Sequence, residues 1–419
     1  MMKILIGYPP LDQSRGIPLV SQNRQFQRFK KPTYVYPYLL ACMATALRNQ
    51  GHQVFWLDCI RHNWTPSMLT NFLLTQSIDR IIWEIKTPTM PETMRIGAEI
   101  KIRFPSISIE NIGEPLTNGN YDRNLSGELC LIPDRFLTHW EDYAYHNGNF
   151  KHTPGTYTMF ARNCWWGKCT FCAWGDNFFG IEPIQLTPTQ AVLDVAYCHQ
   201  ALKAKEIFDD SGSFPIKDWC REFCTIMIAS GMKVRLGCNV RFTNVGDYPF
   251  NLMKQAGFRF LLWGLESANQ TTLDRLHKGT FLRLIEDSLE SAASVGLENH
   301  LTVMVGFPWE DESAVENTCL FIRKISPHLH SLQVSLCMPY PNTTLYKEVK
   351  DYIIQSDYSK WDMSEPVLSC NHDVLQARRK IYQSVITPSF IINRIIRGGL
   401  KDAIRSLGYY LSHLREFSR

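Results

Sequence analysis

The 419-residue sequence has no apolar run that approaches the roughly eighteen residues of a membrane-spanning helix. Its first residues read as a strand and lack the apolar segment and small-residue cleavage site of a signal peptide. The net charge is only +4 and no basic stripe stands out, which argues against a nucleic-acid partner. These absences predict a cytoplasmic protein without a transmembrane segment. Disulfides are rare in reducing compartments, so the thirteen cysteines are interpreted as thiols plus a metal cluster.

Three cysteines lie within one short stretch that has no fourth cysteine or histidine nearby. They are Cys164, Cys169 and Cys172. A closed structural zinc site needs four such ligands, whereas three thiolates on a [4Fe–4S] cluster leave one iron open for a substrate or cofactor. We favour the open-iron cluster on these three metal ligands. A zinc ribbon with a distant fourth ligand is the alternative.

The segment CWWGKCTFC, residues 164–172, resembles the cluster-binding loop of radical S-adenosylmethionine (SAM) enzymes. The usual spacing in that family is C-x₃-C-x₂-C with an aromatic residue before the third cysteine, and this chain has one more residue in the first gap. The resemblance implies that Cys164, Cys169 and Cys172 hold the catalytic cluster. It also implies that the open iron chelates SAM, that Phe171 stacks against its adenine, and that a flavodoxin or ferredoxin donates electrons. Phe171 as an ordinary core aromatic is the alternative.

Strands and helices alternate over residues 3–115, which predicts a parallel doubly wound sheet. The expected strands are 3–7, 54–57, 80–85 and 107–112, and the expected helices are 36–49, 67–74 and 92–104. This half resembles the cobalamin-binding-like Rossmann domain that precedes the radical core in one subgroup, through residues 8–10, 46–54 and 87–89 in that order. Residues 116–150 are compressed relative to that subgroup and include a polar stretch at 118–124. The shortened domain therefore either binds cobalamin or only supports the core.

Residues 156–348 contain repeated strand–helix units, which predict a (β/α) barrel. The expected strands are 206–208, 234–236, 260–263, 301–305 and 332–336, and the expected helices are 189–204, 217–230, 249–255 and 282–295. The resemblance implies a partial six-unit, TIM-like barrel with its chemistry at the carboxyl ends of the strands. The basic, amphipathic end of the chain is expected to pack as helices on the barrel, with an acidic membrane surface as the lesser alternative. We thus expect domains at 1–150, 151–350 and 351–419.

The strand ends supply the expected cofactor contacts. Asp209 and Asp210 follow the second core strand, where the family contacts the SAM amino group, although turn formation is an alternative role for both. Asn239 and Arg241 follow the third strand, and Arg241 is a candidate for the SAM carboxylate unless it is a surface arginine.

Two further motifs of the family follow the fourth and fifth strands. Gly264-Leu265-Glu266-Ser267 resembles G-x-E-S, which places Glu266 and Ser267 near the ribose or the methionine end of SAM. The stretch from Gly306 to Glu310, which includes Pro308, resembles the turn whose backbone lies against adenine.

The resemblance implies a radical SAM enzyme that cleaves SAM reductively to a 5′-deoxyadenosyl radical. Within that class we favour cobalamin-dependent methylation of an unactivated carbon in a small molecule or peptide. A cobalamin-independent rearrangement, cyclisation or oxidation is the first alternative. A non-catalytic metal-binding protein on the same barrel is the second.

Overall fold

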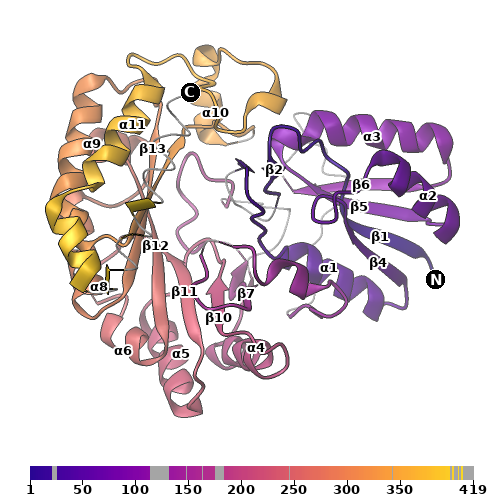
Figure 1. Cartoon of the computed structure of the whole chain (residues 1–419), viewed down its shortest axis with the longest axis horizontal. Helices are drawn as coiled ribbons and strands as arrows, with labels where there is room; N and C mark the ends of the chain where they lie inside the picture. Colours follow the sequence, from indigo (N-terminus) through magenta and orange to yellow (C-terminus); the bar gives the residue numbers. More distant parts are fainter. Residues whose placement is uncertain are drawn as a thin grey trace.

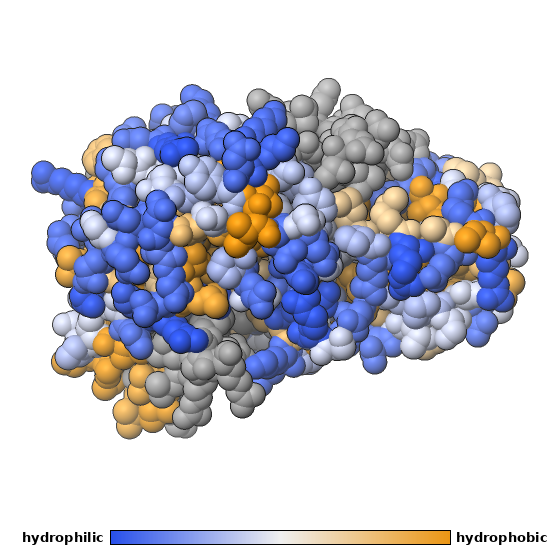
Figure 2. Space-filling model, turned by 90° about the horizontal axis from the view of Figure 1, so that it is seen from above, coloured by the Kyte–Doolittle hydropathy of each residue, from blue (hydrophilic) through white to orange (hydrophobic). Residues whose placement is uncertain are grey.

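The computed structural model describes residues 1–20, 26–113, 132–147, 149–162, 164–174, 184–244, 246–341, 343–396, 399–400, 404 and 407–408. Two α/β domains lie side by side (Figure 1). The polar stretch at 118–124 and most of the basic residues at the end of the chain fall outside the described residues. The helices of the described part include none that is long and apolar enough to cross a bilayer. Polar residues predominate on the face in Figure 2, with apolar residues scattered among them.

The N-terminal domain is a four-stranded parallel sheet in the order β4-β1-β5-β6. Its strands are β1 (Lys3–Tyr8), β4 (Gln53–Asp58), β5 (Arg80–Ile85) and β6 (Ser108–Gly113), and its helices are α1 (Tyr38–Asn49), α2 (Pro66–Gln76) and α3 (Met90–Arg103). All four expected strands and three expected helices are present. A short antiparallel pair, β2 (Ile17–Pro18) with β3 (Arg28–Phe29), was not predicted.

The two faces of this sheet bury different sets of side chains. Leu5, Ile81 and Trp83 pack with α2 and α3 in a small separate core. Ile4 and Ile6, which alternate with Leu5 along β1, point to the other face and join α1 in a core that continues into the second domain. Because α1 is enclosed between this sheet and the second domain, nine of its twelve residues are buried.

The second domain is a six-stranded parallel sheet in the order β14-β13-β12-β11-β10-β7. Its strands are β7 (Gly155–Thr158), β10 (Glu206–Asp209), β11 (Arg235–Val240), β12 (Phe258–Glu266), β13 (Glu298–Val305) and β14 (Ser331–Leu336). The connecting helices are α4 (Pro188–Gln200), α5 (Lys217–Ser230), α6 (Phe250–Gln255), α7 (Gln270–Arg275), α8 (Leu282–Ser294) and α9 (Glu312–Ile325). Within this sheet the strands lie side by side in chain order, as expected for a partial six-unit barrel. Between β7 and β10, the short strands β8 (Ala161–Arg162) and β9 (Ile184–Gln185) form a separate antiparallel pair.

Some of the expected element bounds need correction. β12 is longer than expected and includes Glu266, and β7 is a strand that was not predicted separately. The expected helical extension from residue 351 contains only short turns, such as η7 (Tyr358–Lys360), before α11 (Val374–Val385) packs on α9 and β14. The stretch before α11 instead reaches the N-terminal domain, where Asp362 lies 2.7 Å from the guanidinium of Arg15.

A fully buried ion pair joins the two domains. Arg135, in the connection between them, donates to both carboxylate oxygens of Asp194 on α4, at 2.8 and 3.2 Å. Its guanidinium also donates to the carbonyl of Tyr157 in β7 at 3.0 Å and lies 5.5 Å from the ring of Tyr38 in α1. Elements of both domains therefore contact the same side chain.

Candidate functional site

The three cysteines of the 164–172 loop are half-buried beside the carboxyl end of the barrel strands. The loop is fixed at Thr170, whose backbone N–H donates to the carbonyl of Leu276 at 3.1 Å and whose carbonyl accepts from the N–H of Leu345 at 2.8 Å. These bonds tie the loop to the end of α7 and to the start of α10 (Thr344–Glu348). The loop is therefore part of a defined surface of the barrel.

A glycine after β10 permits the close packing of Cys164. A Cβ at Gly212 would lie 2.9 Å from the Cβ of Cys164 and 3.0 Å from the indole of Trp174. Any larger residue would push the first cysteine and Trp174 out of position. The segment after β10 thus forms a close backbone support for the cysteine loop.

Trp166 holds the segment between Cys164 and Cys169 against residues 277–279. Its indole N–H donates to the carbonyl of His277 at 2.9 Å, and the guanidinium of Arg241 lies 3.9 Å from its ring centroid. Gly279 makes this packing possible, because a Cβ there would lie 2.3 Å from the indole. Arg241 also donates to the carbonyl of Lys278 at 2.5 Å. Arg241 therefore contacts the cysteine loop and the segment that supports it. The sequence analysis had expected its guanidinium to be available for the SAM carboxylate.

A buried ion pair lies next to the cysteines. Glu266, the last residue of β12, accepts from the Lys278 ammonium at 2.8 Å, and both side chains are 9% exposed. Glu266 has φ +69°, and the register of β12 against β13 shifts at this point. A Cβ at Gly264 would lie 2.4 Å from the Glu266 carboxylate, so glycine leaves room for the pair on this side of the strand.

Lys278 belongs to the same site as the cysteines. Its ammonium lies 5.6 Å from the ring centroid of Phe171. Burial lowers the pKa of Lys278, but the Glu266 carboxylate and the Cys169 thiol raise it, and the net direction is upward. Sequence analysis identified Glu266 but missed Lys278. The signal available was chemical, since a carboxylate after an apolar strand needs a nearby cation once it is buried.

The two predicted aspartates differ in their roles. Asp209 accepts from the backbone N–H of Phe160 at 2.8 Å and from the Ser211 hydroxyl at 2.9 Å, which is the turn-forming role. Burial raises the pKa of Asp209 to about 7. Asp210 accepts instead from the Asn239 amide at 3.2 Å, and that amide also donates to the Ser211 carbonyl at 2.9 Å. Asp210 and Asn239 are thus hydrogen-bonded to each other, while Asp209 fixes the backbone at Phe160 and the side chain of Ser211.

The predicted residues after β12 and β13 form a second group around Glu310, the last residue of the predicted turn, to which the sequence analysis assigned no role. Glu310 accepts from the hydroxyls of Ser267 at 2.6 Å and Thr272 at 2.7 Å, and burial raises its pKa. Gly306 has φ +93°, and a Cβ there would lie 3.1 Å from Val374 at the start of α11. The carbonyl of Pro308 accepts from the Asn371 amide at 3.2 Å. These contacts join the two turns to each other and to the start of α11.

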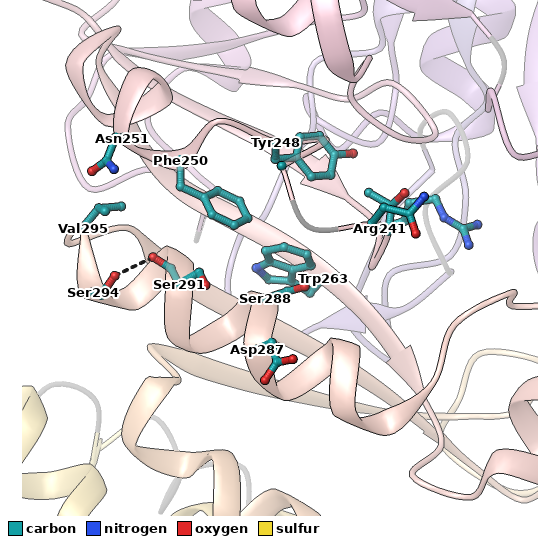
Figure 3. A pocket seen from close by; sticks show the side chains of 13 residues that line it. Arg241, Tyr248, Phe250, Asn251, Trp263, Asp287, Ser288, Ser291, Ser294 and Val295 are labelled. Carbon is teal, nitrogen blue, oxygen red and sulfur yellow. Dashed lines mark hydrogen bonds between the residues drawn. The ribbon is translucent and has the colours of Figure 1, made fainter.

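A cavity of about 320 Å³ lies outside the barrel wall, between α8 and the connection that follows β11 (Figure 3). The rings of Phe250 and Trp263 line it, and Trp263 stacks on Phe242 with ring centroids 4.6 Å apart. On the α8 side the Ser294 hydroxyl donates to the carbonyl of Ser291 at 2.8 Å. Arg241 closes one end, so the cavity adjoins the support of the cysteine loop.

The N-terminal sheet carries buried polar groups at its carboxyl edge, where parallel sheets bind ligands. The Tyr8 hydroxyl donates to the Glu84 carboxylate at 2.7 Å across β1 and β5. The Tyr143 hydroxyl donates to Asp58 at the end of β4 at 2.9 Å. Burial raises the pKa of both Tyr8 and Asp58.

A family model described as the Radical SAM superfamily matches residues 158–322, from the end of β7 into α9. The chain carries a radical SAM domain. The matched part includes the cysteine loop, the Glu266–Lys278 pair and the turn at Gly306. It favours the [4Fe–4S] interpretation of the three cysteines over the zinc alternative.

Solved radical SAM enzymes share the fold of the whole chain. The cobalamin-dependent S-adenosylmethionine radical enzyme OxsB, solved with aqua-cobalamin, matches with a TM-score of 0.67 at 11% identity, over 100% of this chain and 72% of that chain. The radical SAM methyltransferase TsrM from Kitasatospora setae, solved with cobalamin and a [4Fe-4S] cluster, matches with a TM-score of 0.66 at 11% identity, over 98% and 100%. The predicted fold, a Rossmann-like domain followed by a partial (β/α)6 barrel, is confirmed.

A curated relative is an uncharacterized methyltransferase from Pyrococcus horikoshii, 24% identical over 270 residues. The match covers 59% of this chain and 57% of that protein, so the chain spans little more than half of the relative's length.

The donor set of this radical SAM domain fits a cubane cluster. Three soft thiols come from one loop, and Gly212 provides the close support that the first of them needs. A cubane holds its protein ligands on separate irons, so its thiolates need not converge on one point. Among the described residues, no three His, Cys, Asp or Glu side chains converge on a single metal ion.

Proposed function

We propose that the protein is a cobalamin-dependent radical SAM methyltransferase that methylates an unactivated carbon of a small molecule or peptide. The observation that carries the proposal is the cysteine loop set directly beside the buried Glu266–Lys278 pair. A redox cluster that bound no amino acid would need no pair of opposite charges next to it. An amino-acid zwitterion does need such a pair.

Cys164, Cys169 and Cys172 would hold the cluster. Bound together, the cluster and SAM supply a 5′-deoxyadenosyl radical for hydrogen abstraction. The Lys278 ammonium would bind the α-carboxylate of SAM, and the Glu266 carboxylate would accept from its amino group. Each charge would then exchange one buried partner for another, so neither would be left unpaired in a region of low dielectric.

The other side chains would position the cofactor and the loop. Phe171 offers an apolar surface beside Lys278, and Asp210 with Asn239 offers a carboxylate and an amide at the next two strand ends. Arg241 would keep Trp166 and the cysteine loop in place by stacking. Glu310 would hold the Ser267 turn against the Gly306 turn through its hydrogen bonds.

The cobalamin part of the proposal rests on the N-terminal domain. Its sheet order reverses direction between β1 and β5, and the buried Tyr8–Glu84 pair bridges these two strands at the carboxyl edge. Ligands of open α/β sheets bind at such a switch point. The likeness of the whole chain to cobalamin-bound structures supports this position. The methyl group would come from methylcobalamin held there.

The first test is anaerobic reconstitution with iron and sulfide, followed by SAM, dithionite and hydroxocobalamin. We expect 5′-deoxyadenosine by mass spectrometry and a cobalamin spectrum that survives desalting. Deoxyadenosine without retained cobalamin would leave a radical enzyme of another reaction type. A fully assembled cluster that yields no deoxyadenosine and retains no cobalamin would refute the proposed function.

The second test separates SAM binding from cluster assembly. Glu266→Gln should keep its iron content and weaken SAM binding at least about 30-fold, equivalent to about 2 kcal/mol, because a charged partner is lost inside a buried site. Glu290→Gln, the same change at an exposed position of α8, serves as the matched control. Equal SAM affinity in both variants would show that Glu266 does not contact the cofactor.

A further inference from the structure

The outer surface of the cysteine loop combines exposed aromatic and cationic groups. Trp165 is 38% exposed, and the Lys168 side chain is exposed and lies 5.2 Å from the ring centroid of Trp166. The Trp165 indole N–H donates to the carbonyl of Phe214 at 3.2 Å, so the ring is held in place at the surface. The two tryptophans lie in the chain between Cys164 and Cys169. This surface is therefore the outer covering of the proposed cluster.

Two neighbouring segments extend this surface. The bonds of Thr170 to Leu276 and Leu345 bring residues 274–279 and α10 against the loop. These segments expose His277 and Lys347 to solvent. We name the surface formed by Trp165, Lys168, His277 and Lys347 the loop face.

The loop face carries the charges of two lysines, and exposed Asp274 in the neighbouring segment accepts from the Gln270 amide at 2.8 Å. Arg275 is paired with Glu348 at 3.8 Å, and buried Lys278 is paired with Glu266, so these four charges offset one another. Within the described part of the chain, Lys168 and Lys347 form no ion pair. The loop face thus combines an exposed indole with two lysines that form no ion pair among the described residues.

We infer that the loop face is the docking site of an acidic one-electron carrier protein of the flavodoxin or ferredoxin class. This inference rests on the proposed function, since a radical SAM cluster must be reduced from outside. In the transfer the carrier loses one electron and the cluster gains it, and no atom crosses the interface. Docking here would place the carrier against the cysteine loop, so that only the side chains of this loop would separate it from the proposed cluster.

The composition of the loop face matches what such an encounter needs. Complexes for electron transfer bury small areas and form transiently. Opposite charges on the partners raise the rate of encounter, and this steering weakens as salt is added. Aromatic residues are enriched at interfaces, and Trp165 exposes its indole on this surface. A fixed loop also spares the cost of ordering it on binding.

The test compares a protein donor with a small-molecule donor on the reconstituted enzyme. Rates of deoxyadenosine formation are measured for Lys347→Glu with reduced bacterial flavodoxin and, separately, with dithionite. We expect kcat/KM for flavodoxin to fall about tenfold or more at low salt and its dependence on ionic strength to flatten. The dithionite rate should stay within about twofold of the wild type, with equal iron content.

Lys205→Glu is the matched control, because this exposed lysine lies at the amino end of β10, opposite the loop face. It should leave the flavodoxin rate and its salt dependence unchanged. A Lys347→Glu variant that keeps the wild-type flavodoxin kinetics would overturn the docking site, and so would an equal loss with both donors. Absence of deoxyadenosine from the wild type with dithionite would instead refute the proposed function itself.

Discussion

The buried Arg135–Asp194 pair permits a direct test of how the two domains are held together. Both side chains are 0% exposed, and their two hydrogen bonds are joined by a third from Arg135 to the Tyr157 carbonyl. Replacing Arg135 by Met removes the cation and leaves the Asp194 carboxylate in the interior. The nearest remaining polar group recorded for it is the Cys198 thiol at 3.9 Å.

The expected cost follows from that loss. Breaking a buried pair by removing one partner destabilises a protein by about 3–5 kcal/mol, because the other charge stays buried without compensation. Replacing both residues by apolar ones of similar volume, Arg135→Met with Asp194→Leu, should cost clearly less than the two single changes together. Arg95→Met is the matched control. Its partner Glu99 is 54% exposed and Arg95 itself 55%, so the change should stay within about 0.5 kcal/mol.

The assay is urea unfolding followed by tryptophan fluorescence and far-UV circular dichroism in parallel. In a protein with two domains these probes can separate, so each transition is fitted on its own. We expect the midpoint of the transition that involves α1 and α4 to fall in the single variants. A loss below about 1 kcal/mol for Arg135→Met, no larger than that for Arg95→Met, would refute the reasoning.

Two further predictions concern single residues of the barrel. Gly279→Ala should lower the iron content after reconstitution, because the added Cβ would lie 2.3 Å from Trp166; Gly231→Ala, with φ +66° and nothing within 4 Å of its Cβ, should keep the iron and lose only stability. Equal iron content in the two variants would contradict the packing argument. The pKa of Asp209 is raised by burial to about 7, so the folded state holds a proton that the unfolded chain has released above about pH 4. Stability from this group should therefore fall as pH rises from 5 to 7, by up to about 1.4 kcal/mol per pH unit, and Asp209→Asn should remove that part of the slope in urea titrations. Parallel slopes for the two proteins would exclude the assignment.

The fold could be predicted because its signals are local, and the three cysteines stood out for the same reason, although their role as cluster ligands remains a proposal. Cys164, Cys169 and Cys172 lie within nine residues. The strands of both domains coincide with apolar runs, which can be recognised without knowing their partners in the sheet. The positions of Glu266 and Gly306 at strand ends were predictable for the same reason, since Glu266 is the last residue of β12 and Gly306 follows β13 directly. The roles of these residues at the site remain proposals.

The partners of the site residues could not be predicted, because they depend on tertiary contacts. Lys278 meets Glu266 only where the register of β12 shifts, and Glu310 receives Ser267 only where two strand ends meet. Arg241 had the right position for a cofactor contact, yet its neighbours are an indole and two backbone carbonyls. A strand-end position therefore indicates where a side chain starts but not what it contacts.

The arrangement of the domains bears on the proposed transfer of a methyl group. The turn at Thr87–Thr89, which follows β5, contacts η7 in the stretch that comes after the barrel. The Tyr340 hydroxyl, just after β14, accepts from the backbone N–H of Phe26 at 3.4 Å. The carboxyl edges of both sheets are thus attached to one shared set of connections. The proposed methyl transfer would require the carboxyl edges of the two sheets to face the same substrate. A domain that only supported the barrel would not need its switch point tied to this end, and this supports a working cofactor site.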